Sequence, residues 1–340
     1  MVIAFPKANK LWIGVVAFVA LTADVASSQP RDRSSLPRPS LDADIANSQL
    51  MQGLSQRSLK VGDRERTYFI HSPSPGRRAM PVVIALHGGN GTAPRRARQM
   101  GFNEIGDREG FIAVYPQGVN YGWNDGRGTP EMLRRQENAD DVAFFRALLG
   151  ELRRLPEVDP QRIYIVGGSN GGMMTHRLAC EIPEMFAGAV AMVASLPEPL
   201  RETCQPQVSV PILMMNGTAD PLVPYGGGNV GGAGAIDQGR VIPAEETLAF
   251  WIKTNACKGA PEETTAPDRD LEDGMRTEIR TWKRCRDGVQ VSFFKMNGAG
   301  HGLPGRSRTK AALAEELGGR STNDFDSSEE AWAFLKRFRR

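Results

Sequence analysis

The strongest constraint on the fold of this chain is a predicted strand that runs directly into a glycine-rich turn. Residues 162–166 (RIYIV) have the composition of a strand buried in a parallel sheet. The turn GGSNGG (167–172) follows at once, and residues 173–180 continue as a predicted helix. Such a turn holds the Ser169 hydroxyl at the carboxyl edge of the sheet, near a helix N-terminus that favours negative charge. The glycines suit the turn because side chains beside the serine would collide with the strand or the helix.

Strand and helix signals alternate along the rest of the chain. Residues 58–61 and 66–71, joined by Gly62 and Asp63, predict an antiparallel hairpin. Further buried strands are predicted at residues 81–86, 111–115, 187–194, 212–216 and 289–296, and amphipathic helices at residues 140–155 and 327–338. This alternation predicts an α/β fold, a doubly wound and mostly parallel sheet with an N-terminal antiparallel hairpin. We expect a single domain over residues 57–340.

The N-terminus has the pattern of an export signal. Lys7 and Lys10 precede an apolar stretch at residues 11–21, and small or polar residues follow. We predict a signal peptide over residues 1–28. A membrane anchor is the alternative, although the apolar stretch is shorter than the roughly 20 residues that span a bilayer. Residues 29–56, rich in Pro, Ser, Arg and Asp, predict a disordered leader. The mature protein is therefore expected in the periplasm or outside the cell, without stable membrane association.

Composition limits the kinds of partner and site. The four cysteines all follow the predicted signal: Cys180, Cys204, Cys257 and Cys285. In an oxidising compartment they predict two disulfides, and the sequence leaves three pairings open. A metal site is the alternative, but no C-x-x-C motif and no histidine beside a cysteine support one. The chain carries 42 Lys and Arg against 39 Asp and Glu, a net charge of +3, and has no basic tract interleaved with aromatic residues. We therefore expect no metal and no nucleic-acid partner.

Two further loops after predicted strands carry an acid and a base. Asp220 lies just past the strand predicted at 212–216, and His301 lies in a glycine-rich loop, GAGHG, after the last predicted strand. Only His301, of four histidines, lies in such a loop downstream of both Ser169 and Asp220. The chain order Ser, Asp, His is that of an α/β-hydrolase. We predict Ser169 as nucleophile, Asp220 as the acid and His301 as the base, a chemistry that needs no cofactor.

A fourth loop carries candidate donors for the negative charge that develops on a carbonyl oxygen. The loop HGGNG (87–91) follows a buried strand, where the backbone N–H groups of Gly88 and Gly89 can point at the substrate. The N–H of Asn170, just after the nucleophile, is the second predicted donor. Trp123, in the loop GWND, is a candidate substrate contact, and a packed loop aromatic is the alternative.

Together these segments resemble those of a family of secreted esterases, the polyhydroxybutyrate depolymerase-like and feruloyl or acetyl-xylan esterase-like enzymes. The resemblance covers roughly residues 57–340. It rests on LHGGNG (86–91), YPQG (115–118), GWND (122–125), ADDVAFFRAL (139–148), RIYIVGGSNGGMM (162–174), LACEIPEMFAG (178–188), NGTADPLVPYGG (216–227), GAGHGLPG (298–305) and TNDFDSSEEAWAFL (322–335).

The resemblance implies the α/β-hydrolase fold and the same roles for Ser169, Asp220 and His301. It also implies two disulfide pairs, Cys180–Cys204 and Cys257–Cys285. Leu303 stands where related sequences often have a tryptophan after the catalytic histidine. We therefore expect Leu303 in the substrate pocket, with an acyl specificity that differs from that of such relatives.

These observations predict a secreted serine carboxylic-ester hydrolase. Its expected partner is an ester substrate, small, oligomeric or polymeric: a 3-hydroxyalkanoate ester, or a feruloyl or acetyl ester of plant polysaccharide. A serine peptidase on the same fold is one alternative, which an acidic subsite for a substrate amine would favour. A non-catalytic binding protein on a hydrolase scaffold is another, and the presence of all three triad residues argues against it.

Overall fold

The computed structural model describes residues 1–2, 4, 40–73, 79–232, 238–306 and 318–340. Apart from residues 1, 2 and 4, the predicted signal peptide lies outside the described residues, as do residues 29–39 of the predicted leader. Residues Arg38–Arg340 form one compact unit. Within the described ranges, no helix is both long enough and apolar enough to cross a membrane.

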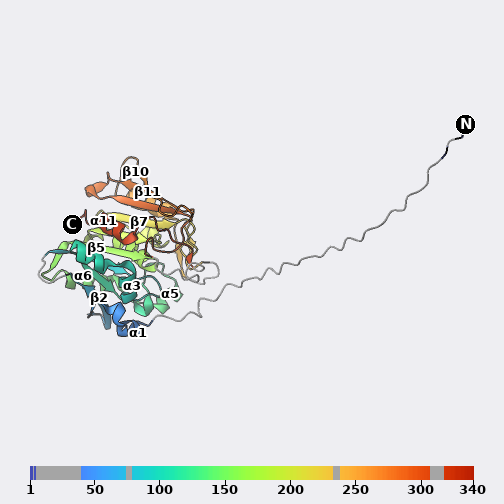
Figure 1. The fold of residues 1–340 in the computed structure, drawn as a ribbon. Helices are drawn as coiled ribbons and strands as arrows, with labels where there is room; N and C mark the ends of the chain where they lie inside the picture. Colours follow the sequence, from blue (N-terminus) through green and yellow to red (C-terminus); the bar gives the residue numbers. More distant parts are fainter. Residues whose placement is uncertain (3, 5–39, 74–78, 233–237, 307–317) are drawn as a thin grey trace. The chain divides into compact units, whose positions relative to one another are not determined.

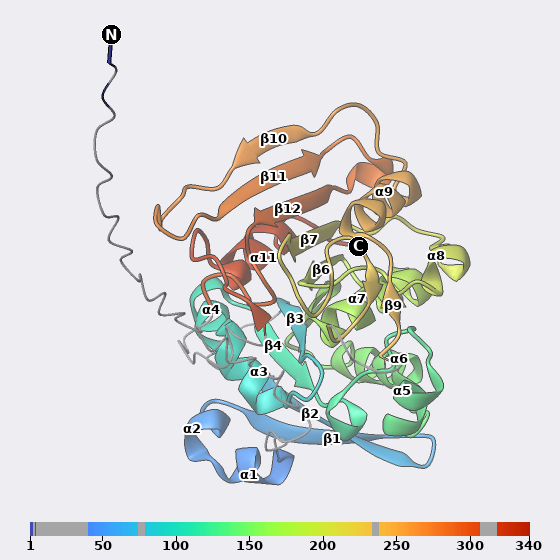
Figure 2. The ribbon, with the colours of Figure 1, turned by 90° about the vertical axis from the view of Figure 1, so that its right-hand side faces the viewer.

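One large sheet organises the described part of the chain (Figures 1 and 2). Its ten strands lie in the order β1-β2-β4-β3-β5-β6-β7-β12-β11-β10. Their bounds are β1 (Ser55–Val61), β2 (Arg64–His71), β3 (Met80–Leu86), β4 (Ile112–Pro116), β5 (Val158–Gly168), β6 (Gly188–Met192), β7 (Ile212–Gly217), β10 (Glu262–Thr265), β11 (Arg276–Trp282) and β12 (Val291–Asn297). The six strands from β4 to β12 in this order run parallel, and the β1–β2 hairpin pairs antiparallel to β4. The predicted mostly parallel sheet with an N-terminal antiparallel hairpin is confirmed.

Helices cover both faces of the sheet, as Figure 2 shows for α3 and α4 on one side and α6 and α7 on the other. Strand residues alternate between two core clusters: Val82 and Ile84 belong to the one that includes residues of α6, α7 and α9, whereas Val83 and Ala85 belong to the one that includes residues of α3, α4 and α11. This alternation is the period of two that a doubly covered strand requires. The helices are α3 (Ala93–Met100), α4 (Phe102–Glu109), α5 (Pro130–Arg135), α6 (Asp141–Leu152), α7 (Asn170–Glu181), α8 (Leu200–Thr203), α9 (Ala244–Thr254) and α11 (Ser327–Leu335).

The antiparallel strands β10 and β11 at the far edge of the sheet were not among the predicted elements. They pair with each other, and β11 pairs with β12. All four residues of β10 are exposed, and its sequence is EETT. An exposed edge strand needs no apolar side chains, so hydrophobic patterning gives no signal for it. The short strands β8 (Gly228–Asn229) and β9 (Arg240–Val241) form a separate pair.

The two disulfides implied by the family resemblance are present. Cys180, in the last turn of α7, bonds Cys204, which follows α8. Cys257, shortly after α9, bonds Cys285, shortly after β11. The first bond therefore fixes the far end of the helix that begins at the glycine-rich turn.

The prediction of a disordered leader is wrong for residues 40–56. They form α1 (Leu41–Ala46), α2 (Ser48–Met51) and the start of β1. The carboxylate of Asp44, which is only 3% exposed, accepts from Thr92 Oγ1 at 2.6 Å and from Arg95 Nε at 2.8 Å. Because both partners lie about fifty residues away, local composition could not reveal this attachment. The segment is bound to the start of α3, directly after the loop HGGNG.

Replacing Asp44 should therefore weaken the fold. Asp44→Asn removes a buried charge-assisted bond and leaves the Arg95 guanidinium without its carboxylate, so we expect a loss of about 1–2 kcal/mol in the free energy of unfolding. Urea denaturation of both proteins measures it. Asp42→Asn, on the exposed face of the same helix, is the matched control. Equal stability of the two variants would contradict the proposed attachment.

Candidate active site

A strained serine marks the junction between β5 and α7. Ser169 has φ 58° and ψ −127°, a backbone conformation that a non-glycine residue adopts at a cost of about 1–3 kcal/mol. Its N–H donates to the Met192 carbonyl on the neighbouring strand at 3.0 Å. A Cβ at Gly167 would lie 2.1 Å from the Gly171 carbonyl oxygen, and one at Gly171 would lie 2.5 Å from the His87 carbonyl oxygen. Glycine is therefore required at both positions for the turn to close.

The structure brings together Ser169, His301 and Asp220, which lie on three different loops. His301 Nε2 lies 2.8 Å from Ser169 Oγ, and His301 Nδ1 lies 2.6 Å from Asp220 Oδ2. The other carboxylate oxygen of Asp220 accepts from the N–H groups of Leu222 and Val223, at 2.8 and 2.9 Å. With Asp220 accepting from Nδ1–H, the Nε2 atom of the imidazole is the one that accepts the hydrogen bond of the Ser169 hydroxyl.

Parallel strands explain why these loops meet. β5, β6, β7 and β12 are consecutive neighbours, so their carboxyl ends share one edge of the sheet. The loops after β7 and β12 approach very closely, since a Cβ at Gly217 would lie 2.3 Å from the Ala299 carbonyl oxygen. This contact brings Asp220 next to His301.

His87 anchors the loop that follows β3. Its Nε2 accepts from the Gly118 N–H at 2.9 Å, so its proton lies on Nδ1, which donates to the Gly88 carbonyl at 2.8 Å. The Gly91 N–H donates to the same carbonyl at 3.1 Å. In a trans peptide the N–H of Gly89 points opposite to the Gly88 carbonyl. It is therefore directed away from the His87 ring, and a Cβ at Gly89 would lie 3.8 Å from Asn170 Cβ.

The side chain of Asn170 is held by the loop GWND. Its Oδ1 accepts from the Trp123 N–H at 2.8 Å, and its Nδ2 donates to Asp125 Oδ2 at 2.6 Å. Asp125 forms a buried ion pair with Arg127 at 2.8 Å. These contacts fix the first residue of α7 and hence the direction of its N–H. Asp125 and Arg127 were missed from the sequence, although GWND was noted for its tryptophan.

Trp123 is packed inside the protein, as in the alternative that the sequence left open. It is fully buried, and its Nε1 donates to the His87 carbonyl at 2.9 Å. Its ring packs against those of His87 and Phe145. Leu303 is also buried, but its Cδ2 lies 3.3 Å from the position of a Cβ on Gly168, directly beside the nucleophile.

Burial keeps His87 neutral. It lowers the pKa of His87 to about 3, and the positive charges of Arg96 and Arg66 also lower it. Burial likewise lowers the pKa of His176, in α7, to about 3. His176 Nδ1 accepts from Trp251 Nε1 at 3.1 Å. The hydrogen bonds of both rings go to groups other than Ser169, whereas His301 Nε2 lies 2.8 Å from Ser169 Oγ.

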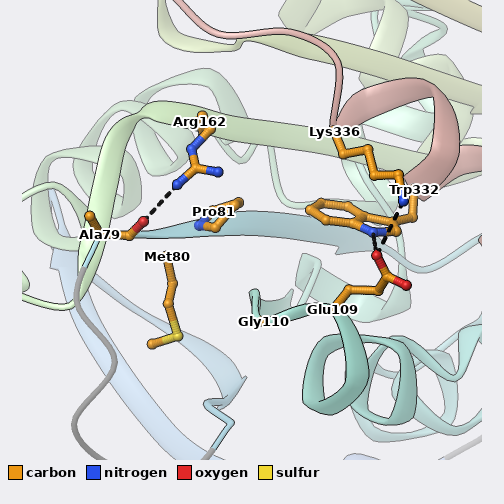
Figure 3. Close-up of a pocket in the computed structure, with 8 residues that line it drawn as sticks. All are labelled: Ala79, Met80, Pro81, Glu109, Gly110, Arg162, Trp332 and Lys336. Carbon is orange, nitrogen blue, oxygen red and sulfur yellow. Dashed lines mark hydrogen bonds and ion pairs between the residues drawn. The ribbon is translucent and has the colours of Figure 1, made fainter.

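A cavity of about 420 Å³ is lined by residues other than Ser169, Asp220 and His301. Figure 3 shows the residues that line it. Met80 lines it at the start of β3, the opposite end of that strand from the loop HGGNG. Its polar groups are already paired: Trp332 Nε1 donates to Glu109 Oε2 at 2.9 Å, and Arg162 Nη2 donates to the Ala79 carbonyl at 2.7 Å. No residue that lines this cavity is a serine, cysteine or histidine. Among the described residues no cluster of three or more His, Cys, Asp or Glu could hold a metal ion.

Comparison with known proteins gives one family and several esterases. The model of the Dienelactone hydrolase family matches residues 66–229. NocK of Nocardia uniformis subsp. tsuyamanensis, whose name describes an esterase, is 33% identical over 73% of this chain and 74% of its own length. Feruloyl esterase B of Piromyces equi is 29% identical over 69% of this chain, and Poly(3-hydroxyalkanoate) depolymerase C of Paucimonas lemoignei is 31% identical over 36%.

The alignments with these last two proteins span 42% and 29% of their lengths. Among solved structures, a thermostable esterase aligns with a TM-score of 0.51 and 17% identity, over 86% of this chain and 64% of the other. At that identity the likeness supports the fold alone.

The two buried histidines should make the fold sensitive to acid. Their pKa values are lower in the folded than in the unfolded chain, so between about pH 6.5 and pH 3 the unfolded state binds more protons. Stability is therefore lost as the pH falls from 7 to 5, by about 2 kcal/mol for each histidine. Urea denaturation at the two pH values measures this loss. His176→Gln should reduce the pH dependence by about half, and an unchanged dependence would contradict this account.

Proposed function

We propose that this carboxylic-ester hydrolase is secreted and acts through a Ser169–His301–Asp220 triad. The premise is that the chain belongs to the dienelactone hydrolase family of α/β-hydrolase esterases. The observation that carries the triad is the chain of contacts at 2.8 Å from Ser169 Oγ to His301 Nε2 and at 2.6 Å from His301 Nδ1 to Asp220 Oδ2. A nucleophile, a base and a group that orients the base, each within hydrogen-bond reach, are the parts that nucleophilic acyl transfer needs.

In the first half of the reaction Ser169 Oγ attacks the ester carbonyl carbon while His301 Nε2 takes the hydroxyl proton. Asp220 stabilises the resulting imidazolium through Nδ1–H. The tetrahedral intermediate collapses as the C–O bond to the alcohol breaks, and His301 returns the proton to the departing oxygen. Water, activated by the same base, then cleaves the acyl-enzyme and frees the acid.

Two backbone N–H groups would bind the developing oxyanion. One belongs to Asn170, the first residue of α7, where the helix dipole also favours negative charge. The other belongs to Gly89, since the bonds from His87 and Gly91 to the Gly88 carbonyl direct the Gly89 N–H away from the His87 ring. Gly88 provides the carbonyl that fixes this peptide, so its own role is positional.

The substrate classes that we propose are 3-hydroxyalkanoate esters and feruloyl or acetyl esters of plant polysaccharide. The names of the related esterases support these classes. The signal pattern of residues 1–28 supports secretion, and so do the two disulfides, which persist in an oxidising compartment.

Removing the nucleophile tests the proposal directly. Ser169→Ala should lower kcat for ester hydrolysis by roughly 10³-fold or more, because no other group can form the acyl-enzyme. Hydrolysis of methyl ferulate and of a soluble 3-hydroxybutyrate oligomer, followed with the purified proteins, measures the loss. Ser58→Ala, at an exposed position on β1, is the matched control and should retain wild-type activity. Near-wild-type esterase activity in Ser169→Ala would exclude the assignment.

The leaving group should separate an esterase from a peptidase. An amide carbonyl is less reactive and its nitrogen must be protonated to depart, so we expect kcat/KM for an ester to exceed that for the matched aminoacyl amide by roughly 10²-fold or more. Parallel assays of the two compounds with the wild-type enzyme measure the ratio. A preference for the amide would favour the peptidase alternative.

A further inference from the structure

A buried arginine lies beside the nucleophile. Arg96, in α3, is only 7% exposed. Its Nη2 lies 3.5 Å from the position that a Cβ on Gly88 would take, and Ser169 Cβ lies 3.4 Å from that same position. The guanidinium also lies 3.6 Å from the Cβ position of Gly168, the residue just before the nucleophile. Because 3.5 and 3.4 Å add to 6.9 Å, Arg96 Nη2 and Ser169 Cβ lie no more than 6.9 Å apart.

The charge of Arg96 has no carboxylate partner among the described residues. Its Nη1 donates to Met100 Sδ at 3.7 Å, a weak acceptor, and its Nε is buried without any acceptor. Two other buried arginines are paired, Arg66 with Asp141 at 2.7 Å and Arg127 with Asp125 at 2.8 Å. Burial lowers the pKa of Arg96 to about 10, so the side chain is still a cation at neutral pH.

Two glycines next to the guanidinium, Gly88 and Gly168, place no side chain beside it. Gly168 lies between the side chains of Arg96 and Leu303, which approach its Cβ position to 3.6 and 3.3 Å. Any longer side chain at Gly168 or Gly88 would occupy the space in front of the guanidinium. The sequence thus combines a buried cation with two neighbouring positions, Gly88 and Gly168, that carry no side chain.

We propose that Arg96 forms an anion subsite for a carboxylate on the substrate, close to the scissile ester. The inference rests on the proposed function of Ser169 and names its substrate class: esters that carry a free acid near the ester bond, such as the acid end of a short 3-hydroxyalkanoate oligomer.

The chemistry of the guanidinium favours this ligand. Its planar donors match the two oxygens of a carboxylate, and charge-assisted bonds of this kind are about twice as strong as neutral ones. A buried cation without a counter-ion is costly, so a bound carboxylate supplies the partner that the described residues lack. A neutral ester would leave the cation desolvated and unpaired. The enzyme should therefore prefer an ester with a free carboxylate over a neutral ester.

The test compares two substrates that differ only in this charge. The dimer of 3-hydroxybutyrate with a free carboxylate is set against the same dimer with a terminal carboxamide, each holding one ester bond. The wild-type enzyme should prefer the free acid by roughly tenfold or more in kcat/KM. Arg96→Met should abolish this preference, Arg96→Lys should keep part of it, and Arg98→Met, an exposed cation on the same helix, should keep all of it.

The ratio of the two kcat/KM values does not depend on how much of a variant folds, so a destabilised Arg96→Met still gives an answer. A wild-type enzyme without preference for the free acid would overturn the proposal. An Arg96→Met enzyme that loses activity equally on both dimers would also overturn it, because Arg96 would then serve the fold or the oxyanion instead.

Binding separates this proposal from the proposed function. Calorimetric titration of the free-acid dimer into the Ser169→Ala protein needs no turnover, and binding should weaken by roughly tenfold or more when Arg96→Met is added. Binding that depends on Arg96 in a protein whose wild type hydrolyses no ester would support the subsite and refute the esterase mechanism. Equal binding with and without Arg96 would overturn the subsite while leaving the mechanism intact.

Discussion

Every other feature of the site depends on the sharp turn between β5 and α7. Ser169 occupies a strained conformation that its surroundings must hold, and they do so by excluding side chains on both sides. Gly171 lets the first turn of α7 pack against the loop after β3, and Gly172 lets it pack against Ala194 at the end of β6. The turn thus fixes Ser169, the N–H of Asn170 and the contact with the loop HGGNG at once.

The parallel sheet, rather than local structure, positions the proposed base His301 and the proposed acid Asp220. Neighbouring parallel strands end at one edge, so residues far apart in sequence, such as Ser169, Asp220 and His301, meet there. A second layer of contacts then sets their orientation. The N–H groups after Asp220 hold its carboxylate, and Asp125 holds the residue that follows the nucleophile. Because these outer contacts are buried, small displacements within them would be transmitted to the reacting atoms.

The sequence predicted the parts that depend on local pattern. Apolar runs located the buried strands of the sheet, and Ser169, Asp220 and His301 were predicted because each lies in a loop or turn just past one of them. Features that depend on distant partners could not be predicted. The helix with Asp44 lies in a segment rich in Pro, Ser, Arg and Asp, and it is attached through Arg95 and Thr92. Trp123 lies in a loop, where nothing local distinguishes a packed ring from an exposed one, and its burial follows from contacts with His87 and Phe145.

The side chains beside Ser169, which form one wall of the proposed site, favour substrate discrimination by charge more than by shape. At Gly168 that wall consists of one aliphatic side chain, Leu303, and one guanidinium, Arg96. An aliphatic wall separates substrates by only about 1–3 kcal/mol per methylene, whereas a buried polar group left unpaired rejects the wrong substrate more strongly. The paired arginines Arg66 and Arg127 are satisfied by carboxylates of the chain and serve the scaffold. Arg96 has no such partner among the described residues, so its charge can pair with a substrate carboxylate beside Ser169.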